Sequence, residues 1–356
     1  MNSCGVLKFR DNNFDLIRLV AAIQVAVYHA CVHLGLDGQE SWGFRLLELF
    51  PGVPVFFFVS GFLISRSFES NSDLGLYVRS RVIRLFPALI VCSFVTIVTI
   101  VCSGYFGEVN VPVADFLIWL LAQLTVFQFY DPDFLAGYGI GQTNGSLWTV
   151  YIEIQFYVLI PLVYIFVLSR LSDKWSLLLL IFSAVIFLVF NRIFYLHNEI
   201  LVYPELFKKT FLPYLYMFIV GVIFQRKFDF FHNLLAGRFI LVFLVYVFTA
   251  LVLTGYSGFH LHNEIGPLLF MILSLVVFSF AFSYRTLSGK LLSGHDISYG
   301  IYIYHMPVVS FFIYIEFTGN MAFLGFSLLT LTVAILSWFA VEKPFMKLKK
   351  KSIRPV

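Results

Sequence analysis

Arg18 and His29 lie eleven residues apart in a long apolar stretch near the N-terminus. In a helix, eleven residues rise about 16 Å and turn by only about 20° overall, so the two side chains share one face. Asp15, three residues before Arg18, can pair with the guanidinium. Either basic group alone could snorkel to the nearest headgroups. Intramembrane ionisable groups normally face an interior cavity, so two on one face beside the small Ala22 favour the wall of a polar channel.

A second polar face is predicted in SLWTVYIEIQFYVLIP, where Ser146, Thr149, Glu153 and Tyr157 follow helical spacing. Glu153 lies about seven residues into its helix and is expected at the depth of His29. A carboxylate and an imidazole at one depth could act as an orienting group and a general base. A structural hydrogen bond between helices is the alternative interpretation.

Two further segments carry polar or small residues inside apolar helices. In SYGIYIYHMP, Ser298, Tyr302 and His305 share one helical face, which we expect in the cytoplasmic half of the membrane. In PGVPVFFFVSGFLIS, the pair Ser60 and Gly61 permits a close approach by another backbone or by a ligand. Ordinary helix packing is the simpler interpretation of that pair.

Three arginines, Arg79, Arg81 and Arg84, occur together in RSRVIRLFP, where a predicted helix begins. Positive charge in short cytoplasmic loops explains such a cluster without any ligand. Guanidinium groups are also what proteins use to bind phosphate, and Arg18 is expected at the same level. The sequence therefore makes a phosphorylated cytosolic ligand plausible.

The composition identifies the environment of these residues. Of 356 residues, 60% are hydrophobic and 12% are charged, and the mean hydropathy is +0.89. Soluble domains have about a quarter charged residues, whereas lipid-facing helices must be apolar outside as well as inside. The four cysteines have no metal-ligand or CxxC spacing, so we expect free thiols and no metal site. The polar segment Met1–Asp15 argues against a cleavable signal peptide.

The sequence predicts an all-α polytopic bundle, with residues 1–356 as a single domain. A spanning helix needs about 20 mostly apolar residues. About ten segments meet this requirement: 14–34, 44–66, 82–103, 146–169, 175–192, 209–226, 238–255, 263–284, 297–316 and 321–342. The segment 113–129 is apolar but short, and Asp115 and Asp131 flank it.

Loop charge decides how segment 113–129 is interpreted. If it does not cross, only Arg45, Arg192, Lys208 and Lys209 of the 24 basic residues fall outside, leaving 20 on the cytoplasmic side. We therefore expect cytoplasmic N- and C-termini and an extracytoplasmic loop 104–145 in which 113–129 is interfacial or re-entrant. The basic tail 343–356 is expected in the cytoplasm beside anionic lipid, and we expect no nucleic-acid binding.

Taken together and in order, these segments resemble the membrane acyltransferase-3 family, whose members are O-acetyltransferases of bacterial surface polysaccharides. No single segment is specific, so the resemblance rests on their order across residues 14–344. The matching segments are FDLIRLVAAIQVAVYH, VFFFVSGFLIS, RSRVIRLFP, SLWTVYIEIQFY, SYGIYIYH and the closing VEKP.

The resemblance implies an O-acyltransferase of the cytoplasmic (inner) membrane. It would transfer acetyl from cytosolic acetyl-CoA to a hydroxyl of a cell-surface glycan, such as an O-antigen or exopolysaccharide unit, at the outer face. Acetyl-CoA would be a co-substrate, with no permanently bound cofactor or metal. The expected partners are acyl-CoA, a glycan or lipid-linked saccharide acceptor and the bilayer, with the oligomeric state left open. The chain ends soon after its last predicted helix, so we expect no extracytoplasmic hydrolase-like domain.

Carried over residue by residue, the resemblance makes His29 the catalytic residue, and we add Glu153 from its predicted depth. Its implied binding residues for acyl-CoA are Arg18, Arg79, Arg81 and Arg84. The expected supporting residues are Asp15, Ser60, Gly61, Trp148, Tyr157, Tyr302 and His305. An extended pantetheine arm is about as long as the helical rise of about 16 Å from Arg18 to His29. General-base catalysis and a covalent acyl-histidine both remain open.

A transporter or flippase is the competing function, because buried charges and broken helices are expected there too. The arginines at the cytosolic mouth and the lack of visible repeats count against it. Labelled acetyl-CoA separates the two classes, since a pure transporter should neither bind it nor release CoA. A membrane anchor or scaffold would not explain charged residues inside the helices.

Overall fold

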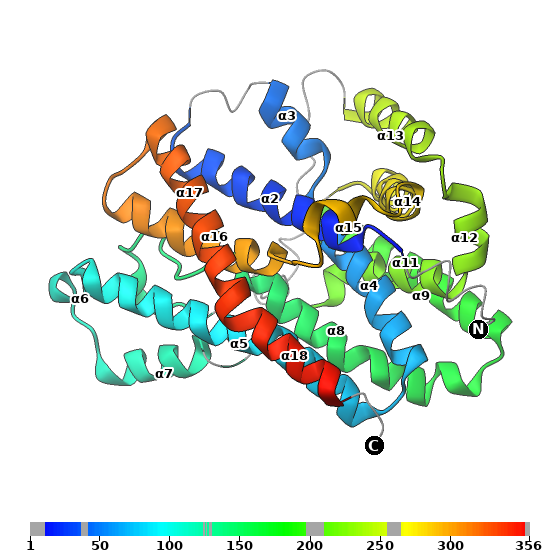
Figure 1. The fold of residues 1–356 in the computed structure, drawn as a ribbon, viewed down its shortest axis with the longest axis horizontal. Coiled ribbons are helices and arrows are strands. Elements are labelled where there is room, and N and C mark those ends of the chain that lie inside the picture. The colour runs from blue at the N-terminus through cyan, green and yellow to red at the C-terminus, as the bar shows by residue number, and fades with distance from the viewer. Residues whose placement is uncertain are drawn as a thin grey trace. The chain divides into compact units, whose positions relative to one another are not determined.

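The computed structural model describes residues 11–36, 42–123, 125, 127, 130–196, 210–254 and 265–352. Across these residues the regular structure is entirely helical, which confirms the predicted all-α class (Figure 1). Five of the basic residues in the charge count lie outside the described residues, namely Lys8, Arg10, Lys208, Lys209 and Arg354.

Within the described residues, six helices are long and apolar enough to cross a membrane. A seventh span results if α12 (Phe228–Leu235) and α13 (Phe239–Thr254), which meet at 88°, count as one. The protein is therefore a multi-pass membrane protein. Each of the ten predicted spans contains a helix, but some of these helices are short, so the count of ten and the cytoplasmic termini stay predictions. The six spans are Phe14–His33, Gly43–Ser70, Leu74–Cys102, Leu147–Arg170, Asp173–Ile193 and Gly319–Leu348.

The chain forms two compact units. The first comprises Met1–Gln24, Trp42–Ser72 and Gln155–Asp296. The second comprises Val25–Ser41, Asp73–Ile154 and Ile297–Val356. Helices α2 (Phe14–His33) and α8 (Leu147–Phe166) each contribute to both units.

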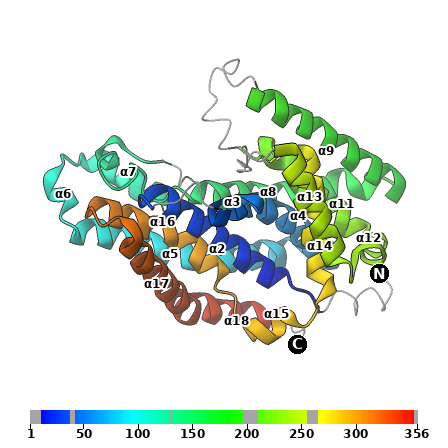
Figure 2. The ribbon, with the colours of Figure 1, turned by 90° about the horizontal axis from the view of Figure 1, so that it is seen from above.

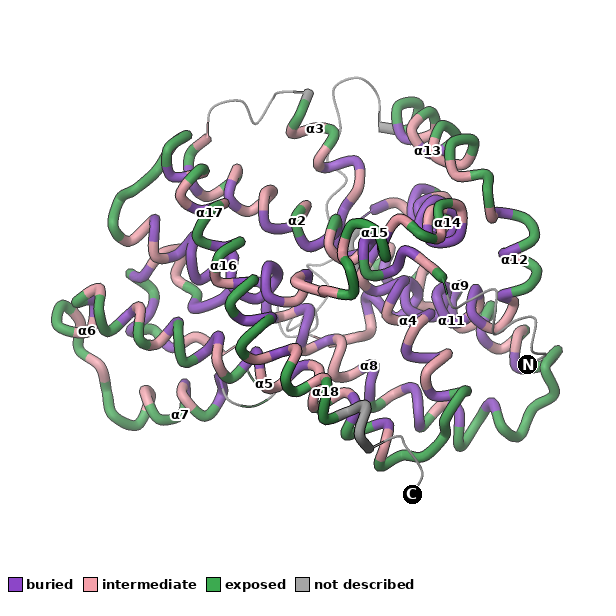
Figure 3. The backbone as a smooth tube through the Cα atoms, in the orientation of Figure 1, coloured by how far each residue is buried: buried purple, intermediate pink, exposed green. Residues whose placement is uncertain are grey.

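Two buried helices, α4 (Gly52–Ser70) and α11 (Leu215–Arg226), form the centre of the first unit (Figure 3). Their backbones touch where both lack a side chain. A Cβ atom on Gly61 would collide with the carbonyl oxygen of Phe218, and one on Gly221 with that of Phe58. Small residues at a crossing allow this close approach, so Gly61 has a packing role. The unit also contains α3 (Trp42–Leu49), α9 (Asp173–Leu196), α12, α13, α14 (Pro267–Ser283) and α15 (Leu287–Leu292).

Asn13 anchors the start of α2 within the first unit. Its side-chain amide donates to the carbonyl oxygens of Phe280 at 3.1 Å and Tyr284 at 2.9 Å. Its side-chain oxygen accepts from the backbone N–H of Ser288 at 2.9 Å. The last carbonyls of α14 and the first N–H groups of α15 have no partner inside their own helices. One buried side chain therefore satisfies both ends and ties them to the segment that carries Arg18.

In the second unit, α16 (Ser298–Tyr314) lies beside α17 (Gly319–Ser337) (Figure 2). The Gly300 position allows this, because a Cβ there would lie 3.0 Å from the Cα of Ala334. Helix α17 continues through a π-helical turn, Trp338–Glu342, into α18 (Lys343–Ser352). The predicted basic tail therefore begins as helix, and its cytoplasmic location stays a prediction.

Helix α5 (Leu74–Cys102) begins eight residues before the predicted span 82–103. Asp73 caps it by accepting from the backbone N–H of Leu76 at 2.8 Å, a strong helix-start signal. Arg79, Arg81 and Arg84 consequently lie on the first turns of the helix and not in the preceding loop. The expectation that these arginines lie in the loop was wrong, because hydropathy marks only the apolar part of a helix and its polar first turns begin at the Asp73 cap.

The segment after α5 packs around a small core that also includes Ile100 of α5. Helices α6 (Tyr105–Glu108) and α7 (Val113–Gln123) and the 3-10 turn Asp133–Leu135 gather around buried aromatic rings. Trp119 donates to the Thr143 hydroxyl at 3.0 Å, and that hydroxyl donates to Asp131 at 2.7 Å. Helix α7 is about 16 Å long, half of a bilayer core of about 30 Å. The extracytoplasmic placement of 104–145 stays a prediction.

Candidate active site

Two histidines from distant parts of the chain meet in the second unit. Nδ1 of His29 on α2 lies 2.9 Å from Nε2 of His305 on α16. The ring centroids are 5.1 Å apart with an interplanar angle of 20°. This separation is close to the N···N distance plus the distance of each nitrogen from its ring centre, so the hydrogen bond is nearly straight and in plane. His29 is partly exposed and His305 is fully buried.

A proline in α16 frees one backbone carbonyl near this pair, and other segments bind that carbonyl. Pro307 has no N–H, so the Ile303 carbonyl loses the donor it would have in a regular helix. The side-chain amide of Asn144 donates to that carbonyl at 2.7 Å, and the Cys92 thiol approaches it at 3.2 Å. Sequence reasoning missed Asn144 and Cys92. The signal for them was a proline inside an apolar helix, which leaves one carbonyl for another segment to bind.

The polar faces predicted on α8 and α16 come together. Ser146 donates to the carbonyl oxygen of Tyr302 at 3.2 Å, and the hydroxyls of Thr149 and Tyr302 are 2.5 Å apart. The Tyr302 ring packs edge-on against the His305 ring, with 5.7 Å between the ring centroids. The first turns of α8 therefore set the position of the α16 segment that carries the buried histidine.

Glu153 lies one turn further along α8 and is partly buried. Its carboxylate interacts electrostatically with the phenol groups of Tyr302 and Tyr77. Arg81 hydrogen-bonds the Tyr77 hydroxyl, and its guanidinium lies 5.2 Å from the centre of that ring. An anionic and a cationic side chain therefore share the neighbourhood of Tyr77. The role of Glu153 as a partner of the catalytic histidine stays a prediction.

The three arginines of α5 do not share one environment. Tyr77, Arg81 and Arg84 are spaced i, i+4 and i+7 and lie on one helical face, where both arginines are partly buried. Arg79 is two positions from Arg81, on the opposite side, and is exposed. Arg81 and Arg84 therefore face one side of α5, and Arg79 faces the other.

Arg18 is paired with two carboxylates of the first unit. Its guanidinium lies 3.6 Å from Asp15, which confirms the predicted ion pair, and 3.4 Å from Asp296. Asp296 is 12% exposed and precedes α16, and sequence reasoning missed it. Any phosphate that binds Arg18 must therefore compete with two carboxylates.

The family model described as an acyltransferase domain matches residues 11–342, almost the whole chain. The chain belongs to the acyltransferase-3 family. The protein is a membrane acyltransferase, as its helices and this match together show.

Two curated relatives of this acyltransferase come from a bacterium and a phage. Nodulation protein 10 of Rhizobium leguminosarum bv. viciae is 29% identical over 95% of this chain and 94% of its own length. The O-acetyl transferase of Shigella phage Sf6 is 32% identical over 42% of this chain and 45% of its own length. No solved structure matches the chain.

Four of the expected supporting residues of the acyltransferase belong to neither α16 nor the His29 half of α2. Ser60, Gly61 and Tyr157 belong to the first unit, where Tyr157 is buried and Ser60 partly buried. Trp148 belongs to the second unit and is partly buried. Gly61 packs against the backbone of Phe218, and Tyr157 is one of the buried core side chains.

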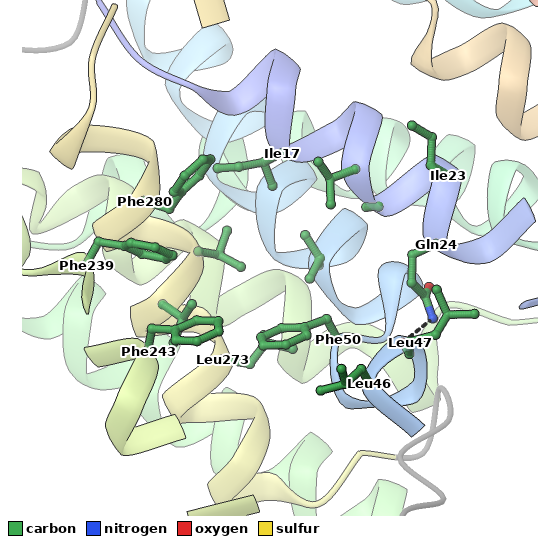
Figure 4. Close-up of a pocket in the computed structure, with 15 residues that line it drawn as sticks. Ile17, Ile23, Gln24, Leu46, Leu47, Phe50, Phe239, Phe243, Leu273 and Phe280 are labelled. Carbon is green, nitrogen blue, oxygen red and sulfur yellow. Dashed lines mark hydrogen bonds between the residues drawn. The ribbon is translucent and has the colours of Figure 1, made fainter. Parts of the chain in front are cut away.

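The first unit of the acyltransferase contains an apolar cavity of about 420 Å³ (Figure 4). Its lining comes from α2, α3, α4, α13 and α14 and the short turn between α3 and α4, and Gln24 is its one polar side chain among the described residues. Gln24 donates to the Leu47 carbonyl at 2.9 Å and accepts from the Gly52 N–H at 2.8 Å. Both hydrogen bonds brace the turn between α3 and α4, so the cavity surface presents hydrocarbon.

Proposed function

We propose that this acyltransferase moves an acetyl group from cytosolic acetyl-CoA to a hydroxyl of a cell-surface glycan at the outer side of the cytoplasmic (inner) membrane. The observation that carries the proposal is the partly exposed imidazole of His29, hydrogen-bonded to the buried His305. The name of one relative, O-acetyl transferase, supports transfer of acetyl to oxygen. The lipid bilayer and a glycan or lipid-linked saccharide are the other proposed partners.

His29 acts as the general base in this proposal. Its Nε2 takes the proton of the acceptor hydroxyl while the oxygen attacks the thioester carbonyl. A C–O bond forms and the C–S bond breaks, and the departing CoA sulfur receives the proton from His29. Imidazole suits both transfers near neutral pH. Acetyl-CoA is thus consumed as a co-substrate, and no cofactor stays bound.

The donor is proposed to bind by its phosphates on the cytoplasmic side. Arg81 and Arg84 share one face of α5, and their guanidinium groups suit phosphate oxygens. Arg18 and Arg79 complete the proposed set. Along the single helix α2, Arg18 and His29 are separated by about 16 Å, close to the reach of a pantetheine arm.

Glu153 is proposed as the second catalytic group. Its carboxylate acts on Tyr302, whose ring packs against His305. A negative charge in that neighbourhood would stabilise the imidazolium that forms on His29 during proton transfer. This role is electrostatic and needs no direct hydrogen bond to His29.

The test uses purified protein in lipid nanodiscs with labelled acetyl-CoA and a lipid-linked saccharide. We expect release of free CoA and one acetyl group per acceptor repeat, measured by mass spectrometry. The His29→Ala variant should lose transfer by about 10² to 10⁴-fold, the usual contribution of a general base. Near wild-type transfer by that variant would end the proposal, as would intact acetyl-CoA with the wild-type protein across a panel of surface glycans.

A further inference from the structure

We propose that His305 is a positioning residue that holds His29 in the tautomer with hydrogen on Nδ1, leaving Nε2 as the reactive base. The contact between the two rings carries the proposal, which rests on the proposed role of His29 as general base. A neutral imidazole has one N–H donor and one acceptor nitrogen, and the partner of one nitrogen decides the state of the other.

The carbonyl of Ile301 sets the direction of the hydrogen bonds. It lies 3.3 Å from Nδ1 of His305 and can only accept. Nδ1 of His305 therefore carries the hydrogen, and Nε2 of the same ring has the lone pair. That lone pair accepts from Nδ1 of His29, so Nε2 of His29 is unprotonated. If His305 instead donated from Nε2 to His29, its Nδ1 would carry a lone pair that faces the lone pair of the Ile301 carbonyl.

The buried ring cannot easily turn away from this arrangement. Tyr302 packs against it, and Ser146 and Asn144 bind the two carbonyls of α16 that lie just before it, those of Tyr302 and Ile303. These hydrogen bonds hold the helix that carries the ring. A rigid second group that sets the orientation of a catalytic imidazole is what efficient proton transfer requires.

The arrangement also serves the charged state of His29. When Nε2 of His29 takes the hydroxyl proton, the ring becomes an imidazolium, and its Nδ1–H donates to the neutral His305. This hydrogen bond becomes charge-assisted and shortens without any proton leaving Nδ1. The proton on Nε2 then goes to the CoA sulfur, and both rings return to their initial tautomers.

Two substitutions separate the acceptor role of His305 from its bulk. His305→Phe keeps a ring but removes the acceptor, whereas His305→Gln can place a carbonyl oxygen near the position of Nε2. We expect His305→Phe to lower kcat by about 10² to 10⁴-fold with little change in KM, and His305→Gln to stay within about tenfold of wild type. Equal activity of the two variants would overturn the proposal, as would a normal kcat for His305→Phe.

His33 provides the matched control. Its ring centroid lies 6.0 Å from that of His29, and His29 makes its ring hydrogen bond with His305 among the described residues. His33→Phe should change kcat by less than about threefold. A loss as large as that of His305→Phe would mean that any change of a nearby ring disturbs His29, and would overturn the specific role of His305.

A spectroscopic measurement tests the tautomer without relying on turnover. ¹⁵N NMR of histidine-labelled protein, assigned by difference with His29→Gln, should show His29 with hydrogen on Nδ1 in the wild type. In His305→Phe the hydrogen should move to Nε2. Hydrogen on Nε2 in the wild type, or no change in the variant, overturns the proposal. The Nδ1 tautomer in a protein that transfers no acetyl would instead uphold this inference and refute the proposed function.

Discussion

His29 and His305 are 276 positions apart in the chain, yet their rings share a hydrogen bond. The sequence expectation paired His29 with Glu153 because depth was counted from the ends of apolar segments. That method measures position along each helix separately and contains no information about which helices are neighbours. Both histidines stood among the candidate residues, but His305 was expected in the cytoplasmic half and His29 towards the outer face. Their contact shows that these two depths were wrongly separated, because depth counted along one helix carries no information about its neighbours.

At the same scale, the two environments of the α5 arginines lead to unequal roles. Arg81→Gln should raise the KM for acetyl-CoA by about tenfold or more, since a lost charged hydrogen bond to phosphate costs about 1.5–3 kcal/mol. Arg79→Gln should raise it less, because its side chain is exposed on the opposite face. Steady-state kinetics on detergent-purified variants measures both values.

Lys290→Gln removes an exposed charge on α15, serves as the charge control and should leave KM unchanged. Equal increases in KM for Arg79→Gln and Arg81→Gln would contradict the prediction that the Arg81 face of α5 binds the phosphates more strongly than the Arg79 face.

The link between Asn144 and Ile303 gives a second residue-scale prediction. Asn144→Asp removes the donor from a buried carbonyl and should lower the free energy of unfolding by about 1–3 kcal/mol. Pro307→Ala restores a backbone N–H to α16, so the same Asn144→Asp change should cost less in that background. Thermal unfolding of the two single variants and the double variant completes the cycle. Strict additivity would contradict the role assigned to the proline.

At the scale of elements, the sequence predicted helices better than their ends. All ten apolar segments contain a helix, because hydrophobic runs of that length have few alternatives in a bilayer. Hydropathy starts this helix at residue 82, although Asp73 is a cap, because the first turns of α5 are polar. Pro307 inside α16 and the break at Pro51 could be located in the sequence, but the groups that compensate for them could not.

The crossing of α4 and α11 makes an element-scale prediction. Gly61→Ala and Gly221→Ala should each lower the free energy of unfolding by about 1–3 kcal/mol or more, because the added methyl meets backbone that cannot move aside. Gly289→Ala in α15 is the control, since its Cβ would meet nothing within 4 Å. That change should be neutral or stabilising by up to about 1 kcal/mol. Chemical or thermal unfolding in detergent gives the comparison, and a harmless Gly61→Ala would contradict the packing assignment.

For the molecule as a whole, orientation in the membrane is a prediction from loop charge. Asp115 at the start of α7 is expected outside, and Lys290 in α15 inside, and both side chains are exposed. In a cysteine-free background, an impermeant maleimide applied to intact cells should label the Asp115→Cys variant and leave the Lys290→Cys variant unlabelled until the cells are permeabilised. The reverse pattern would invert the predicted topology.

The proposed tautomers of His29 and His305 leave this pair of rings without net charge in the resting state. A catalytic carboxylate hydrogen-bonded to His29 would keep a permanent anion within the hydrocarbon layer, at a cost of several kcal/mol if unpaired. Two neutral rings avoid that standing cost, and charge arises on His29 only during proton transfer. On these tautomers, the histidine pair itself needs no counter-ion between turnovers.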